Sequence, residues 1–131
     1  MKELAVKGLF LIAGLINFVP LAGVTGDVLL QSSYGIEIAS PELSLLLRHR
    51  AVLFGILGGM LLVAAFKPSL RTVASVCGIV SMASFAALYG IIGPDALQLT
   101  GVLRADIVGI VALGAAIGLS AKGKAAPTDA A

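Results

Sequence analysis

The chain has 131 residues, of which 59% belong to the hydrophobic set and only 12% are charged. Globular proteins are roughly 45–50% apolar and about 25% charged, so this composition excludes an ordinary soluble domain and predicts an integral membrane protein. Disordered and collagen-like chains are excluded for the same reason. The formal net charge of +2 is too small to indicate a nucleic acid as partner.

Four apolar stretches approach or exceed the roughly 20 residues that a helix needs to cross a hydrocarbon core. They cover residues 7–25, 41–66, 70–92 and 101–121. We favour an uncleaved first span over a signal peptide, because no clear A-x-A cleavage site follows it and more spans come after it. The predicted fold is all-α, a four-transmembrane-helix bundle in one membrane domain, residues 1–121, with residues 122–131 as a disordered cytoplasmic tail.

The connections between these spans carry local signals. Residues 26–40 mix polar and apolar side chains and predict a short interfacial helix. Ser40, Pro41 and Glu42 predict the start of the second span, because serine suits the N-cap, proline the first helical position and glutamate the positive end of the helix dipole. The short turn at residues 67–71 predicts that the second and third helices are antiparallel neighbours.

Lysine and arginine are unevenly divided between the two sides of the predicted bundle. The side with both termini holds Lys2, Lys7, Lys67, Arg71, Lys122 and Lys124, whereas the other holds Arg48, Arg50 and Arg104. The positive-inside rule therefore predicts that both termini are cytoplasmic and that residues 26–40 lie outside. We expect a multi-pass protein of the bacterial inner membrane.

Three basic residues, Arg48, His49 and Arg50, interrupt the second span. Residues 51–66 form a helix of only about 24 Å, so the outer end of the span must include or approach the triplet. Arg48 and Arg50 point about 160° apart, so at least one of them is expected to face the bundle. The alternative is that these side chains reach outward to lipid head groups.

An acidic partner for this triplet is expected from the fourth span, whose outer end contains Arg104 and Asp106. Asp106 is the predicted partner of Arg48 or Arg50, because an unpaired charge at this depth costs about 2–3 kcal/mol or more. Asp27, at the outer end of the first span, is a further candidate. The predicted ligand-binding or polar cluster thus comprises Arg48, His49, Arg50, Arg104, Asp106 and Asp27.

Helix packing is predicted from one polar residue, one proline and several small residues. Asn17 lies in the middle of the first span and Pro20 is expected to bend it; the asparagine is predicted to bond a backbone carbonyl or another helix, with a ligand contact as the alternative. Small residues predict close helix contacts and are compatible with a dimer. These are Gly55 and Gly59, Gly114 and Gly118, and a stripe of Ala74, Gly78, Ser81 and Ser84.

Three other side chains complete these expectations. Cys77, the single cysteine, excludes an intramolecular disulfide and is expected to fill a small space in the core. Tyr34 and Tyr89 are expected at the outer interface. No catalytic motif, metal site or cofactor is predicted, and we do not expect an enzyme.

The run LLRHRAVLFGILGGMLLVAAF, residues 46–66, resembles a family of small bacterial four-helix membrane proteins with an RHRAVLFG-type signature. Two further stretches, GVTGDVLLQSSYGIEIASPEL and RADIVGIVAL, look like the same family, so the resemblance covers most of the chain. The layout is similar to DoxX-like proteins and implies a multi-pass topology without naming a reaction. Members sometimes carry the label phosphopantetheine adenylyltransferase, but such an enzyme is a soluble α/β protein with an HxGH motif, which this chain lacks.

The leading hypothesis is an inner-membrane protein whose polar cluster binds a lipid, a quinone-like molecule or another small amphipathic ligand. One alternative is a small dimeric transporter, although multidrug exporters of this size rely on a first-span glutamate where this chain has Asn17. Another is a structural or assembly partner of a second membrane protein. The expected partners are membrane lipids and a second copy or another membrane protein.

Overall fold

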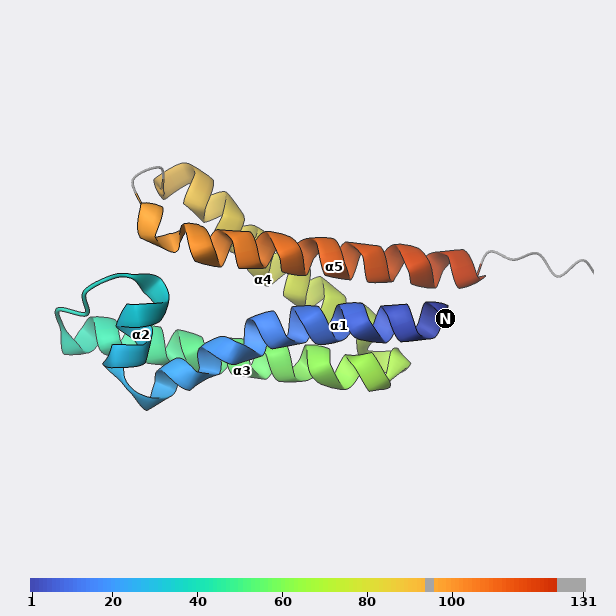
Figure 1. Ribbon diagram of the computed structural model, residues 1–131, viewed down its shortest axis with the longest axis horizontal. Coiled ribbons are helices and arrows are strands. Elements are labelled where there is room, and N and C mark those ends of the chain that lie inside the picture. Colours follow the sequence, from blue (N-terminus) through green and yellow to red (C-terminus); the bar gives the residue numbers. More distant parts are fainter. Residues whose placement is uncertain (94–95, 125–131) are drawn as a thin grey trace, which may run out of the picture.

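The computed structural model describes residues 1–93 and 96–124, and in these residues it is built from helices without a strand. The all-α prediction is therefore confirmed. Short 3₁₀ segments join or extend the α-helices (Figure 1). In chain order the elements are α1 (Lys2–Phe18), η1 (Val19–Thr25), α2 (Asp27–Tyr34), α3 (Pro41–Phe66), η2 (Pro68–Leu70), α4 (Arg71–Ile92), η3 (Leu97–Leu99) and α5 (Thr100–Lys124).

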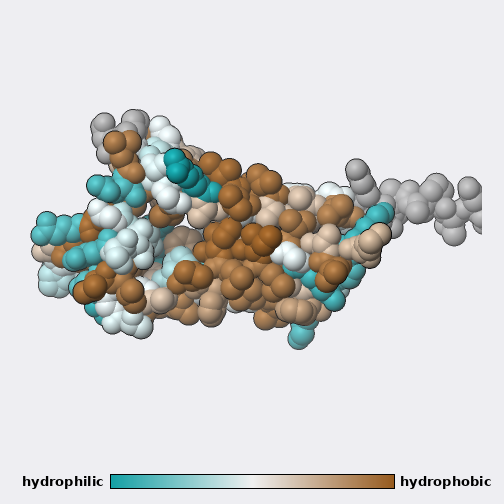
Figure 2. Space-filling view, viewed as in Figure 1, coloured by the Kyte–Doolittle hydropathy of each residue, from teal (hydrophilic) through white to brown (hydrophobic). Residues whose placement is uncertain are grey.

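Four helical segments are long and apolar enough to cross a membrane, which makes the chain compatible with an integral membrane protein. Figure 2 shows the apolar surface as a band over the middle of the bundle, with hydrophilic residues gathered toward both ends. The segments are Lys2–Thr25, Pro41–Phe66, Pro68–Ile92 and Leu97–Ala121, close to the predicted spans. Helix α5 continues past the predicted end at residue 121 to Lys124, and residues 125–131 of the predicted tail lie outside the described part of the chain.

The four long helices form a closed ring in which each contacts two others. Helix α1 lies against α3 and α5, and α4 lies against the same two helices from the other side. The chain direction alternates, so the N-terminus, the α3–α4 turn and the last turn of α5 share one end of the bundle (Figure 1). Helices α3 and α4 are the antiparallel neighbours that the short turn predicted, and α2 lies at the opposite end of the bundle, called here the α2 end.

The first span changes from α-helix to 3₁₀-helix at Val19, and Pro20 lies at the start of that tighter segment. Proline has no backbone N–H, so the carbonyl of Ile16 loses its helical donor and the regular α-helix ends there. The predicted distortion at Pro20 is confirmed. As a result η1 departs from the line of α1 and forms one side of a space beneath α2.

Glycines allow α3 to approach the C-terminal end of α1 and η1 closely, and the tightest position is Gly58. A Cβ atom there would lie 2.7 Å from the Cα of Phe18 and 2.8 Å from the carbonyl carbon of Asn17, both of which are backbone atoms that cannot rotate away. Gly55 has a similar role against the side chain of Leu21, at 2.7 Å. Gly59 has only a ring atom at 4.0 Å, so the predicted glycine spacing of α3 is corrected to Gly55 and Gly58.

The other small residues divide between the core and the outer surface. Gly78 approaches Leu113 of α5 and Ala74 is buried, in agreement with the predicted contact face of α4, whereas Ser84 of the same predicted stripe is exposed. A Cβ atom added at Gly114 or Gly118 would have nothing within 4 Å, so within the described chain these glycines form no close helix contact. Cys77 is exposed, and its predicted place in the core is wrong.

Arg71 fastens the end of the bundle that holds the N-terminus. Its side chain is 13% exposed and pairs with both carboxylate oxygens of Glu3 on α1, at 2.6 and 3.0 Å. The same guanidinium donates to the carbonyls of Ala64 and Ala65 near the C-terminus of α3. These carbonyls have no helical donor at a helix end, so Arg71 satisfies them and joins three helices at once.

The predicted interfacial helix is present as α2, and both of its flanks follow ordinary helix rules. Gly35 ends α2 with a φ of 64°, the left-handed conformation that glycine adopts without strain. The Ser40 hydroxyl then accepts the backbone N–H of Leu43 at 3.2 Å, which confirms the predicted cap of α3. Since α2 packs mainly on η1, it covers the α2 end of the bundle without being part of the helix ring.

Candidate functional site: a cavity beneath α2

Two residues of the predicted polar cluster, Arg48 and Asp27, form an ion pair. Nη2 of Arg48 lies 3.0 Å from Oδ1 of Asp27, and the guanidinium also donates to the backbone carbonyl of Val24 at 3.3 Å. Ser44, one turn before Arg48, donates its hydroxyl to the same carboxylate oxygen at 2.5 Å. Asp27, rather than the predicted Asp106, is therefore the partner of Arg48.

The environment of Asp27 favours its charged form. Donation from Ser44 and then from Arg48 holds the pKa of this carboxyl below its ordinary value of 3.8. Both donors belong to α3 and the carboxylate belongs to the first turn of α2. The bonded network consequently ties α2 to α3 and stays charged at neutral pH.

Arg50 faces in another direction and lies among aromatic rings. Its guanidinium carbon is 5.4 Å from the ring centre of Tyr34 on α2, 4.9 Å from that of Phe54 and 5.2 Å from that of Phe85 on α4. Such cation–π contacts stabilise a cation that is partly removed from water. The prediction that at least one arginine of the triplet faces the bundle is confirmed for Arg50, which is half-buried.

Asp106 is buried on α5 with an exposed fraction of 5%, and its Oδ2 has no hydrogen-bond partner. Arg50 contacts the rings of Tyr34 and Phe54, which line the same cavity as Asp106. Among the described residues, however, no nitrogen of an arginine lies within 4.0 Å of its oxygens. The predicted direct ion pair of Asp106 with Arg48 or Arg50 is therefore absent, and the carboxylate faces open space.

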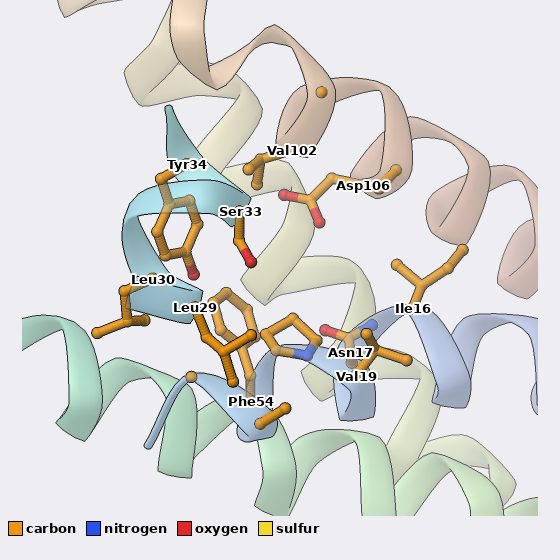
Figure 3. A pocket seen from close by; sticks show the side chains of 15 residues that line it. Ile16, Asn17, Val19, Leu29, Leu30, Ser33, Tyr34, Phe54, Val102 and Asp106 are labelled. Carbon is orange, nitrogen blue, oxygen red and sulfur yellow. The ribbon is translucent and has the colours of Figure 1, made fainter. Parts of the chain in front are cut away.

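That space is a cavity of about 400 Å³, bounded by α1 and η1 on one side, α2 above, α5 opposite and Phe54 of α3 at its base. Its walls are mainly apolar. The polar groups of Asn17, Ser33 and Asp106 come from three different elements and point into it (Figure 3). Mostly apolar clefts of this size with a few convergent polar groups are typical binding sites for small molecules.

Asn17 contributes a second unpaired oxygen to this cavity. Its side chain is 2% exposed, and Nδ2 donates to the Ala13 carbonyl at 2.9 Å and approaches Sδ of Met82 at 3.6 Å. These two acceptors fix the amide orientation, which leaves Oδ1 buried without a donor. Asn17 thus has the predicted hydrogen bond to a backbone carbonyl. Its Oδ1 remains available for the alternative role, a contact with a ligand.

The remaining predicted site residues lie apart from the cavity. His49 and Arg104 are exposed, and Asp27 and Arg48 line a separate shallow groove next to Ser40. Tyr34 was predicted at the wet interface, but it is only 5% exposed and lines the cavity. Tyr89 pairs with the Thr100 hydroxyl at 3.1 Å. The structure therefore divides the predicted cluster between an ion pair, a cation beside aromatic rings and a buried carboxylate.

Ser33, Tyr34 and Phe54 were not predicted as members of a site. The spacing of Leu30 and Tyr34, one helical turn apart, was the available signal, because it places both on one face of α2. Both are buried, so this face of α2 turns toward the bundle and covers the cavity. In the described part of the chain, no three His, Cys, Asp or Glu residues group together in a way that would hold a metal ion.

The chain matches no protein-family model, no curated protein and no solved structure.

Proposed function

We propose that this protein is a membrane-embedded binding protein that holds a small amphipathic ligand in the cavity beneath α2. The single observation that carries this proposal is the pair of unpaired buried oxygens, Asn17 Oδ1 and Asp106 Oδ2, on one cavity. A buried acceptor without a donor costs about 1–3 kcal/mol, and more when it is charged. A bound head group that donates a hydrogen bond would remove that cost, and this favours binding of a ligand in the cavity.

The apolar walls support the amphipathic part of the proposal. Val19 and Leu29 line the cavity and also belong to the exposed apolar surface, so the rim of the cavity reaches the face that a lipid bilayer would cover. A molecule in the bilayer can therefore enter sideways and leave its tail among lipids. Membrane lipids and lipid-like small molecules are the natural source of such a ligand.

A cavity-filling substitution tests this proposal. We would purify the protein in native-lipid nanodiscs and compare the co-purifying small molecules of wild type, Ala105→Phe and Ala115→Phe by mass spectrometry. Ala105 lines the cavity, whereas Ala115 lies on the exposed face of the same helix. A species retained by wild type and Ala115→Phe but lost from Ala105→Phe supports binding in the cavity. Identical spectra for all three proteins would refute it.

The proposal includes the setting of the protein. We assign it to the bacterial inner membrane with both termini in the cytoplasm, a topology supported by the excess of lysine and arginine on that side. The α2 end then faces the outside and the ligand occupies the outer leaflet. The RHRAVLFG-type signature is the basis for placing it with a family of small bacterial four-helix membrane proteins whose layout is similar to that of DoxX-like proteins.

A small transporter is the second candidate, and one observation favours it. Asp106 places a buried carboxylate beside a cavity within a membrane span, an arrangement frequent in proton-coupled transport. The first span has no such carboxylate, which is the difference from known exporters of this size. If overexpression of the wild type raises resistance to cationic dyes and overexpression of Asp106→Asn does not, the result would support transport over ligand binding alone.

A further inference from the structure

We infer that the ligand of this cavity is a neutral, hydroxyl-bearing amphiphile, a long-chain alcohol or phenol, whose O–H donates to Asp106 or to Asn17. This inference rests on the proposed function and adds the chemical class of the ligand. It follows from three features of the cavity: the kind of hydrogen-bonding atom left free, the charges around it, and the way it opens to the surface.

The buried polar atoms of the cavity that lack a partner are acceptors, whereas the Ser33 hydroxyl, which can also donate, belongs to an exposed residue. Asn17 uses its amide nitrogen within the protein, so only its carbonyl oxygen faces the cavity. Asp106 presents Oδ2 without a donor from the described residues. A ligand that only accepts hydrogen bonds, such as an ether or an ester, leaves these oxygens unpaired, whereas a hydroxyl group satisfies one of them directly.

The charges beside the cavity select a neutral head group. Asp106 is the charged residue in its lining, and Arg50 lies against the rings of Tyr34 and Phe54, which also line it. An anionic head group would be repelled by Asp106, which lines the cavity, and a cationic head group would be attracted by Asp106 but repelled by Arg50. A neutral head group is the one that neither charge repels. The other nearby pair, Arg48 and Asp27, is neutralised within itself.

The opening of the cavity selects a ligand with an apolar tail. Its volume of about 400 Å³ accommodates a head group and the first part of a chain. Asn17 and Asp106 are deeply buried, whereas Val19 and Leu29 at the rim are exposed. The hydroxyl therefore lies inside and the tail continues outward along the apolar surface.

The test uses four probes with the same tail and different head groups: 1-dodecanol, 1-methoxydodecane, dodecylammonium and dodecanoate. Each is added at equal concentration in the bilayer to wild-type protein in nanodiscs, and specific adducts are counted by native mass spectrometry. We expect the alcohol to exceed the ether by about tenfold, as for one buried hydrogen bond. We expect the alcohol to exceed both charged probes as well.

Matched variants place this preference in the cavity. Asp106→Leu and Asn17→Leu should each bring the alcohol-to-ether ratio closer to one, whereas Arg104→Gln, exposed on the same helix as Asp106, should leave it unchanged. Asp106→Asn keeps the side-chain shape and one carbonyl oxygen, so it should retain part of the preference. The comparison of probes on the wild-type protein does not depend on any variant being stable.

The outcomes separate this inference from the proposed function. Equal binding of alcohol and ether, or the strongest binding by dodecylammonium or dodecanoate, overturns the inference and leaves a cavity that binds amphiphiles. The absence of specific adducts with all four probes overturns both. An alcohol preference that survives Asp106→Leu and Asn17→Leu shows that the hydroxyl binds elsewhere and overturns the inference too.

Discussion

Arg48 on α3 holds Asp27 on α2 at an Nη2–Oδ1 distance of 3.0 Å, and it holds the Val24 carbonyl of η1 with the same guanidinium. One cation thus fastens two of the elements that surround the cavity to the longest helix of the bundle. Neither Arg48 nor Asp27 lines the cavity itself. Their role in this structure is to position α2 above it.

The attachment of α2 should depend on pH. The pKa of Asp27 is lowered in the folded protein, so its contribution to stability is present above its ordinary value of 3.8 and is lost as pH falls through the lower folded value. We expect hydrogen-exchange protection of residues 27–34, corrected for intrinsic rates, to fall between about pH 6 and about pH 2.5.

Two variants isolate Asp27 in that measurement. Asp27→Asn should show weak protection of α2 at both pH values, because the charge that Arg48 binds is gone. Glu37→Gln changes an exposed carboxylate in the following loop and should behave like wild type. A loss of protection at low pH that persists fully in Asp27→Asn would assign the effect to another group.

Gly58→Ala should strongly destabilise the bundle. The new methyl group would meet backbone atoms of Phe18 and Asn17, which cannot move without displacing the end of α1. Overpacking of this kind costs about 1–3 kcal/mol, and the rigid neighbours favour the upper part of that range. Thermal unfolding in detergent followed by circular dichroism measures it. Gly90→Ala is the control, because a Cβ atom there would have nothing within 4 Å, and it should change stability by about 1 kcal/mol or less. Equal effects of Gly58→Ala and Gly90→Ala on stability would disprove the predicted contact.

Arg71→Leu should lower stability more than Glu3→Gln does. The leucine removes donors from two α3 carbonyls as well as from Glu3, and hydrogen bonds made by a charged group contribute about 1.5–3 kcal/mol. Glu3→Gln removes only an exposed partner and leaves the carbonyl contacts in place. Melting temperatures of the two variants under one condition decide this, and a larger fall for Glu3→Gln would show that the ion pair dominates.

The membrane orientation has a direct test because the chain contains one cysteine. With Cys77 replaced by serine, a cysteine at position 37 should react with a membrane-impermeant maleimide added to intact cells. A cysteine at position 2 should react only after the membrane is opened. The reverse pattern would place the α2 end in the cytoplasm.

The sequence was sufficient to predict the spans, the helix start at Ser40 and the neighbouring pair α3 and α4, because these depend on local signals. Length and hydropathy define a span. The short turn between α3 and α4 is too short for them to be anything but adjacent helices. Pro20 acts on its own helix, so its effect was predictable as well.

The partners of charged residues were less predictable, because they depend on where separate helices meet. Asp27 and Asp106 both lie near the predicted outer boundary, and no spacing rule states which of them reaches Arg48. Gly58 was missed for a related reason: Gly55 and Gly59 form the familiar spacing, but the rotation of α3 against α1 places Gly58 at the contact. The cavity requires α2 to fold back over η1, which no local pattern indicates.

The most direct test of ligand binding beneath α2 is photo-cross-linking with a long-chain alcohol that carries a diazirine near its hydroxyl group, followed by peptide mapping. If the cavity is the binding site, labels will concentrate in residues 16–23, 29–34 and 101–106 and will be displaced by excess 1-dodecanol. Labels spread over exposed apolar faces such as residues 73–80, without displacement, would contradict it.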